Sequence, residues 1–219
     1  MTTAQTDYTR KAARYIEGVL SGRIPACRFV RQACERQRRD IEKAKTGKGR
    51  YIFSRQAANR ICRFIECLTH VKGEKAGEAI HLEPWQVFIL TTIFGWLDRK
   101  TGKRRFRKCY IEVPRGNGKS TMLSGVGLYL LTADGEKGAD IYSFATTKDQ
   151  ARIVFADALA MARGNRDFRE AYGVTPLAHS IVVIGTNSKF LAKSSDADTL
   201  DGLNTHGGII DELHAHKTR

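Results

Sequence analysis

The stretch Val113-Pro-Arg-Gly-Asn-Gly-Lys-Ser120 decides the fold of this chain. It follows residues 109–113, whose apolar side chains predict a β-strand, and it opens residues 119–131, whose spacing predicts a helix. A glycine-rich turn in this position directs backbone N–H groups and the positive end of the helix toward a phosphate. The stretch therefore predicts a phosphate-binding turn, and a simple glycine turn is the alternative.

The turn departs from the strict pattern G-x-x-x-x-G-K-[ST], because Val113 stands at the place of the first glycine. We expect Lys119 to reach the outer phosphates of ATP and the Ser120 hydroxyl to take one coordination position of Mg²⁺. Arg115 can neutralise charge that develops on the γ-phosphate, and an exposed turn arginine is the alternative. The ATP-binding residues predicted in this turn are Pro114, Arg115, Gly116, Asn117, Gly118, Lys119, Ser120 and Thr121.

A short apolar strand near the end of the chain carries two carboxylates, Asp211 and Glu212. ATP hydrolysis needs one acid to hold the hydrated Mg²⁺ and another to orient and deprotonate the attacking water. We assign the first role to Asp211 and the second to Glu212. Many strands end in acidic residues, but this strand follows a phosphate-binding turn. The turn and the acidic strand together predict one ATP site, in which Lys119, Arg115 and Glu212 are the catalytic residues.

Strands and helices alternate in the second half of the chain. The pattern predicts strands at residues 139–145, 180–184, 189–192 and 208–211, with 180–184 and 189–192 as a hairpin, and helices at 119–131 and 148–163. Alternation at this spacing is typical of βαβ units. We therefore predict an α/β core with a parallel sheet over residues 108–219.

The first half has a different character. Apolar residues recur at helical spacing in four stretches, near 8–19, 29–41, 54–68 and 84–97. Residues 1–108 hold 25 Lys and Arg against 10 Asp and Glu, whereas residues 109–219 hold 12 against 13. We predict a basic helical region over residues 1–107 with a polyanionic partner; the alternative is that its basic helices are merely solvated.

Composition excludes several classes of protein. The chain has 219 residues, of which 42% are hydrophobic and 27% are charged, so it is not disordered or fibrous. No apolar run approaches the ~20 residues of a membrane-spanning helix. The five cysteines form no C-x-x-C pair, which indicates free thiols in a reducing compartment.

Three weaker signals remain open. Gln86, on the helix before the turn, can give a donor and an acceptor to the adenine edge, or can be a surface residue beside a core tryptophan. Residues 100–108 contain six basic side chains and can be a solvated lead-in or a contact to a phosphate backbone. His206, His214 and His216 have no convincing Cys or carboxylate partners for zinc.

Several motifs in this order resemble the ATPase half of the large subunit of tailed-bacteriophage terminases. They are the phosphate-binding turn, Leu82-Glu-Pro-Trp-Gln86, Ala145-Thr-Thr-Lys-Asp-Gln-Ala151, Leu200-Asp-Gly-Leu203 and Ile209-Ile-Asp-Glu-Leu-His214. The resemblance implies an additional-strand, RecA-like P-loop NTPase with Walker A and Walker B motifs, preceded by a basic helical subdomain that includes the lid.

The resemblance also implies what this protein works with. Members of that family hydrolyse ATP with Mg²⁺ in a homo-oligomeric ring and drive double-stranded DNA into procapsids. Their partners are a terminase small subunit and the procapsid portal, and they act in the host cytoplasm. They cut DNA with a separate C-terminal nuclease domain. Because the chain ends at Arg219, soon after Glu212, we expect an incomplete ATPase core, no nuclease domain, and low solubility and turnover in isolation.

Two other functions remain in competition. Asp211-Glu-Leu-His214 also fits the acidic box of a DExH-type helicase or restriction translocase, although such enzymes usually lack the Pro-Arg-Gly-Asn of this turn. A protein that binds ATP or DNA without turnover is the third reading.

Overall fold

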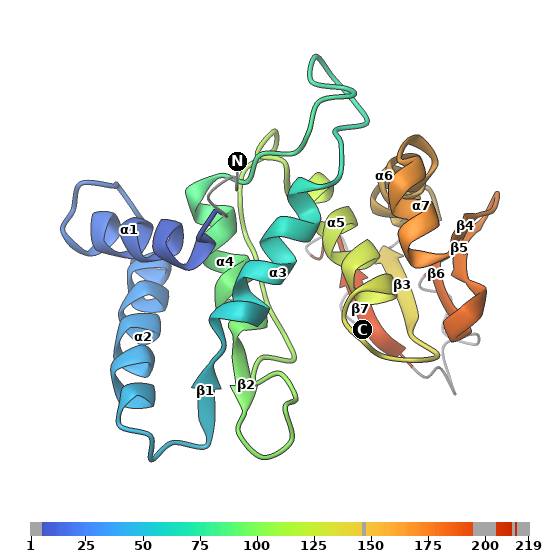
Figure 1. Cartoon of the computed structure of the whole chain (residues 1–219). Helices are drawn as coiled ribbons and strands as arrows, with labels where there is room; N and C mark the ends of the chain where they lie inside the picture. The colour runs from blue at the N-terminus through green and yellow to red at the C-terminus, as the bar shows by residue number, and fades with distance from the viewer. Residues whose placement is uncertain (1–5, 146–147, 195–204, 212, 214–219) are drawn as a thin grey trace, which may run out of the picture. The chain divides into compact units, whose positions relative to one another are not determined.

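The computed structural model describes residues 6–145, 148–194, 205–211 and 213, and its chain forms two compact units (Figure 1). The first unit contains the chain up to Phe64 together with His81–Glu112. The second contains Ile65–Ile80 and the chain from Val113 onward. Contacts thus divide the chain a few residues after position 107, and they assign Ile65–Ile80 to the second unit.

The first unit is mostly helical, as the periodicity predicts. Its helices are α1 (Tyr8–Leu20), α2 (Arg28–Lys45), α3 (Arg55–Glu66), which continues into the second unit, and α4 (Pro84–Gly95). Local chemistry marks their starts, because the Asp7 carboxylate caps α1 and the Ser54 hydroxyl accepts a hydrogen bond from Ala57 N–H. In the described part of the chain, no helix combines the length and the apolar character that crossing a membrane requires.

The prediction that the fourth helix runs to residue 97 is wrong. Helix α4 ends at Gly95, and β2 (Trp96–Asp98) pairs antiparallel with β1 (Tyr51–Phe53). Gly95 permits this change, since a Cβ there would lie 2.6 Å from the Phe53 ring. The change buries Trp96, whose indole N–H donates to Gln37 Oε1 at 2.8 Å. Because α4 is buried on almost every side, apolar spacing does not reveal its end.

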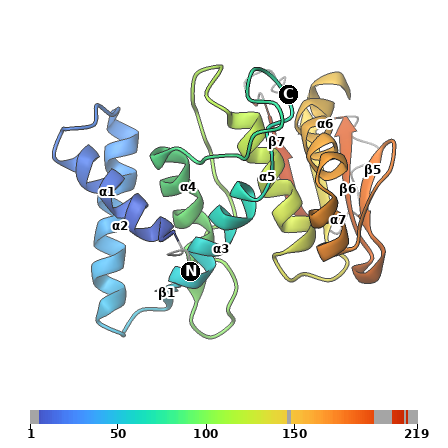
Figure 2. The same ribbon diagram turned by 45° about the horizontal axis from the view of Figure 1, so that its top comes forward.

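The second unit is an α/β domain with one mixed sheet (Figures 1 and 2). Its strand order is β4-β5-β6-β3-β7; β3 runs parallel to β6 and β7, and β4, β5 and β6 are antiparallel neighbours. The elements are α5 (Lys119–Thr132), β3 (Asp140–Ala145), α6 (Lys148–Gly164), α7 (Arg166–Tyr172), β4 (Val174–Pro176), β5 (Ser180–Val183), the 3₁₀ turn η1 (Ile184–Thr186), β6 (Ser188–Ser194) and β7 (Thr205–Ile210). The α/β prediction and the predicted hairpin are confirmed, whereas the sheet is only partly parallel.

The predicted strand at residues 109–113 is not formed. Residues 106–114 are irregular, and Tyr110 is 71% exposed. A strand needs a hydrogen-bonded neighbour as well as suitable residues, and within the described residues none pairs with this segment. The turn therefore adjoins regular secondary structure only on the side of α5.

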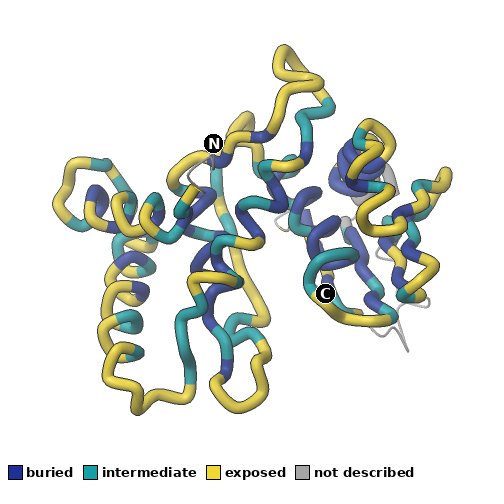
Figure 3. The backbone as a smooth tube through the Cα atoms, viewed as in Figure 1, coloured by how far each residue is buried: buried dark blue, intermediate teal, exposed yellow. Residues whose placement is uncertain are grey.

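Helix α5 lies very close to the sheet, where the core of the second unit is buried (Figure 3). A Cβ on Gly127 of α5 would lie 2.6 Å from Phe190 Cε1 on β6, and a Cβ on Gly207 of β7 would lie 2.7 Å from Leu130 Cδ1. The Phe190 ring is buried and packs edge-on against Phe155 of α6, with ring centroids 5.5 Å apart. Glycine at positions 127 and 207 therefore sets how near α5 comes to the strands.

We predict that Gly127→Ala lowers the free energy of unfolding by about 1–3 kcal/mol, because the added methyl group meets a ring that cannot move freely. Alanine is otherwise favoured over glycine in a helix by up to about 1 kcal/mol. The matched control is Gly164→Ala at the end of α6, where a Cβ meets nothing within 4 Å. Urea unfolding of both variants tests this, and a Gly127→Ala protein as stable as the control would contradict it.

Asp98 closes the turn that follows β2. Its Oδ1 accepts hydrogen bonds from Lys100 N–H and Thr101 N–H, each at 3.0 Å, and its Oδ2 accepts one from Arg50 Nε at 2.6 Å. The Arg50 hydrogen bond is the main cause that lowers the pKa of this carboxyl to about 2, against a usual 3.8.

Because the folded pKa lies below the unfolded one, Asp98 stabilises the fold above about pH 4, and this contribution is lost as the pH falls toward 2. We predict that Asp98→Asn is less stable than the parent at pH 7 and loses less stability between pH 4 and pH 2. The control, Glu42→Gln, removes a carboxylate that forms an exposed ion pair with Lys45. Denaturant midpoints measured against pH check both.

Candidate nucleotide-binding site

The phosphate-binding turn has the backbone that its glycines allow. Gly116 and Gly118 adopt φ angles of 81° and 68°, in the left-handed region that favours glycine. The Asn117 side-chain amide donates to Pro114 O at 3.1 Å and to Arg115 O at 3.3 Å, which braces the turn from within. Gly118 is the N-cap of α5, so the first backbone N–H groups and the positive end of that helix lie at the turn.

The acidic residue after β7 lies against the start of α5. Asp211 Oδ1 is 3.0 Å from Lys119 Nζ, and Asp211 Oδ2 is 3.4 Å from Ser120 Oγ. Asp211 is 6% exposed, and its N–H donates to Phe144 O at 3.3 Å, which extends the β7–β3 pairing by one residue. The structure thus brings together three residues that the sequence analysis singled out for one site.

Ser124 holds the first turn of α5 in place. Its buried hydroxyl lies 2.8 Å from Ser120 O in the preceding turn and 2.8 Å from Val154 O on α6. Sequence analysis missed this residue, although its spacing of four from Ser120 places it on the same face of the helix. It also missed Gly127, for which a glycine inside a predicted helix was the available signal.

The oxygen atoms of Ser120 and Asp211 fit a magnesium ion. Hydroxyl and carboxylate oxygens are the donors that Mg²⁺ prefers, and Mg²⁺ usually takes only one or two protein ligands beside phosphate oxygens and water. The Lys119 ammonium already lies at Asp211, so a positive charge is accommodated there. Across the described residues, no group of three or more His, Cys, Asp and Glu side chains could hold a metal by itself.

Two predicted site residues, Arg115 and Gln86, have contrasting surroundings. Arg115 is exposed in the turn. Gln86 belongs to the first unit and is 7% exposed; its Oε1 accepts a hydrogen bond from Glu83 N–H at 2.9 Å in a capping box of α4. The acceptor atom of Gln86 is therefore engaged in capping α4.

Two further residues singled out in the sequence, Thr121 and His206, lie near opposite ends of α5. Thr121 lies in the first turn of α5. His206 Nε2 lies 2.7 Å from Asp134 Oδ2, just beyond the far end of α5, so this histidine pairs with a carboxylate away from Lys119. Glu212, His214, His216 and Leu200–Leu203 lie outside the described residues.

Comparisons with known proteins agree on one family. A family model described as "Terminase large subunit, ATPase domain" matches residues 84–219. The terminase large subunit of Enterobacteria phage HK97 is 27% identical over 155 residues, which are 70% of this chain and 30% of that protein. The crystal structure of the HK97 large terminase superposes with a TM-score of 0.57 and 25% identity over the same shares of the two chains.

This chain therefore spans about 30% of the length of its HK97 relative. The matched segment begins with α4 and includes the turn, α5 and Asp211. It makes up more than half of the residues, and the chain belongs to the terminase large subunit family through its ATPase domain.

Proposed function

We propose that this chain is the ATPase portion of a phage DNA-packaging motor, which hydrolyses ATP to drive double-stranded DNA into procapsids. The observation that carries the proposal is the convergence of Lys119, Ser120 and Asp211 within a domain of the terminase family. An additional-strand, RecA-like core is part of the proposal. The DExH-helicase alternative is not favoured, because the comparisons find terminases.

Binding of ATP would use the turn and the start of α5. The backbone N–H groups of residues 116–120 and the Lys119 ammonium would hold the phosphates, so that Lys119 exchanges the Asp211 carboxylate for phosphate oxygens. Arg115, which is exposed in the turn, would contact the γ-phosphate. The amide N–H groups of Gln86 would donate to adenine while its oxygen caps α4.

Hydrolysis would depend on the two adjacent acids. Ser120 and Asp211 would hold Mg²⁺, which when bound neutralises charge on the phosphate oxygens. Glu212 would accept a proton from the attacking water and orient it in line with the bond to the leaving phosphate. Asp211 and Glu212 directly follow β7 in the sequence, so Asp211 would serve the ion and Glu212 the water.

The partners of the proposed motor are those of its family. We propose double-stranded DNA as the moving substrate, a homo-oligomeric ring as the active assembly, a small subunit and the procapsid portal as binding partners, and the host cytoplasm as the place of action. A protein that binds ATP without turnover is the competing outcome of the experiments below.

We predict that Lys119→Ala weakens binding of a fluorescent ATP analogue at least about tenfold, because a charge-assisted contact to the phosphates is lost. Lys137→Ala is the matched control, since Lys137 is an exposed lysine in the loop before β3 of the same unit. If both variants bind the ATP analogue with equal affinity, Lys119 does not contact the phosphates.

We predict that Glu212→Gln still binds the ATP analogue with Mg²⁺ but releases phosphate about 100-fold more slowly, because the amide cannot accept the proton of water. Glu136→Gln, at an exposed position, is the matched control. Phosphate release is measured with and without duplex DNA. Parent-like turnover in Glu212→Gln excludes this residue as the base, and a parent chain that binds but never turns over is a binding protein only.

A further inference from the structure

One end of the first unit carries a concentration of positive charge. Residues 42–50, which end α2 and lead into β1, and residues 98–103, which follow β2, contain seven basic side chains and two acidic ones. All seven basic residues are exposed. We call this surface the basic edge, and its basic residues are Lys43, Lys45, Lys48, Arg50, Arg99, Lys100 and Lys103.

The two segments of the basic edge lie side by side. Strands β1 and β2 pair with Tyr51 opposite Asp98, so the turns that precede β1 and follow β2 meet at the same end of the small sheet (Figures 1 and 2). Arg99 N–H donates to Arg50 O at 2.9 Å, and Arg99 Nε donates to Gly49 O at 3.3 Å. Basic residues distant in sequence therefore form one continuous surface.

The acidic residues of the basic edge do not neutralise it. Asp98 binds Arg50 at 2.6 Å, and Glu42 binds Lys45 at 2.7 Å. As far as the described residues extend, Lys43, Lys48, Lys100 and Lys103 form no ion pair. Four exposed ammonium groups thus remain for an external anion.

The basic edge is also held in a fixed shape. The Asp98 carboxylate closes the turn after β2. Arg50 and Arg105 each lie over the Tyr51 ring, at 5.2 and 5.1 Å from its centroid. Arg105 also lies over the Phe106 ring, 5.0 Å from its centroid. Arg105 is anchored to Asp40 at 2.7 Å. A surface ordered in advance loses less entropy when it binds.

We propose that the basic edge binds the phosphate backbone of double-stranded DNA. The charge points to a polyanion, and the choice of DNA among polyanions rests on the proposed packaging function. Lysines on two adjacent turns suit phosphates, which repeat at every ~1.7 Å along a duplex, and such contacts carry no sequence preference. The basic edge would then contact DNA through residues other than those of the ATP site.

The surroundings of the basic edge argue against two other anionic partners. Single strands bind by stacking bases on aromatic rings, but the Tyr51 and Phe106 rings are engaged by arginines. Membrane surfaces are usually bound with apolar side chains beside the basic ones. Among the described residues, the exposed large hydrophobic side chains fall outside 42–50 and 98–103.

The test is a triple variant of the full chain, Lys48→Gln with Lys100→Gln and Lys103→Gln. Binding to a short labelled duplex of random sequence is followed by fluorescence anisotropy between about 50 and 200 mM salt. We expect affinity to fall at least about tenfold near 0.1 M salt. The dependence of log affinity on log salt should flatten by about 2.7 if each lysine contacts one phosphate.

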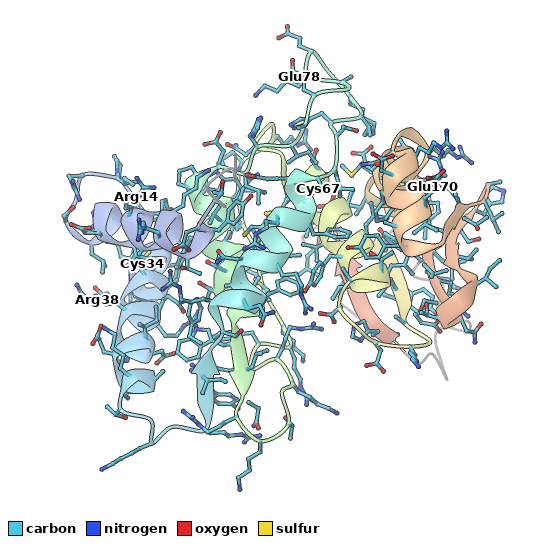
Figure 4. The ribbon with its side chains drawn as sticks, viewed as in Figure 1. Arg14, Cys34, Arg38, Cys67, Glu78 and Glu170 are labelled. Atoms are coloured by element: carbon cyan, nitrogen blue, oxygen red, sulfur yellow. The ribbon has the colours of Figure 1, made fainter. Side chains whose placement is uncertain are left out.

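The matched control removes the same charge elsewhere on the first unit, with Arg14→Gln, Arg28→Gln and Arg38→Gln. These arginines are exposed on α1 and α2, and Arg14 and Arg38 lie on the helical part of the unit, away from the two turns (Figure 4). We expect the control to bind duplex DNA like the parent. Equal weakening in both variants, or no weakening in either, would overturn the proposal.

Two further measurements separate this proposal from the proposed function. In the absence of DNA, the triple variant should bind the ATP analogue and release phosphate as the parent does. Binding to DNA is measured separately, so it tests the basic edge even if the chain does not hydrolyse ATP. Binding of parent and variant to a single strand and to anionic vesicles is measured in parallel. A lysine-dependent interaction that is stronger with either of these than with duplex DNA overturns the assignment to duplex.

Discussion

The close approach of α5 to the sheet is the constraint on which the rest of the second unit depends. At Gly127 and Gly207 there is no room for a Cβ atom, because a side chain of the facing element lies against the backbone at each position. This contact brings the first residues of α5 against the carboxylate that follows β7. The Lys119–Asp211 ion pair and the Ser120–Asp211 contact are consequences of that packing.

Two polar side chains attach residues 65–80 to α6 and to the residue that follows it. Asp157 on α6 is 5% exposed and binds Lys72 at 2.5 Å, and the Asn165 side-chain amide donates to Cys67 O at 3.0 Å. These two contacts explain why Ile65–Ile80 packs with the second unit although its neighbours in sequence belong to the first. An unpaired buried carboxylate would be costly, so Asp157 favours the packing that brings Lys72 to it.

The sequence predicted the four helices of the first unit, and α5, α6, β3, β5, β6 and β7 of the second, from their apolar spacing. It did not predict β1, α7 or β4, which are short. It failed at residues 96–97 and 109–113, where the same residues suit several structures and the outcome depends on a pairing partner. Trp96 joins β2 because Tyr51–Phe53 offer hydrogen bonds, whereas residues 109–113 remain irregular. Helices are decided by neighbours in sequence, and strands by neighbours in space.

The sequence by itself determined the chemistry of this protein: a glycine-rich turn with a lysine and a serine, two late acids, and a first half rich in positive charge. These are matters of residue type and order, which are visible without a fold. Only the tertiary structure decided that Asp211 reaches Lys119 and Ser120, and that lysines from two distant turns form the basic edge. Both depend on strand register and helix packing, which arise from contacts between residues far apart in the chain.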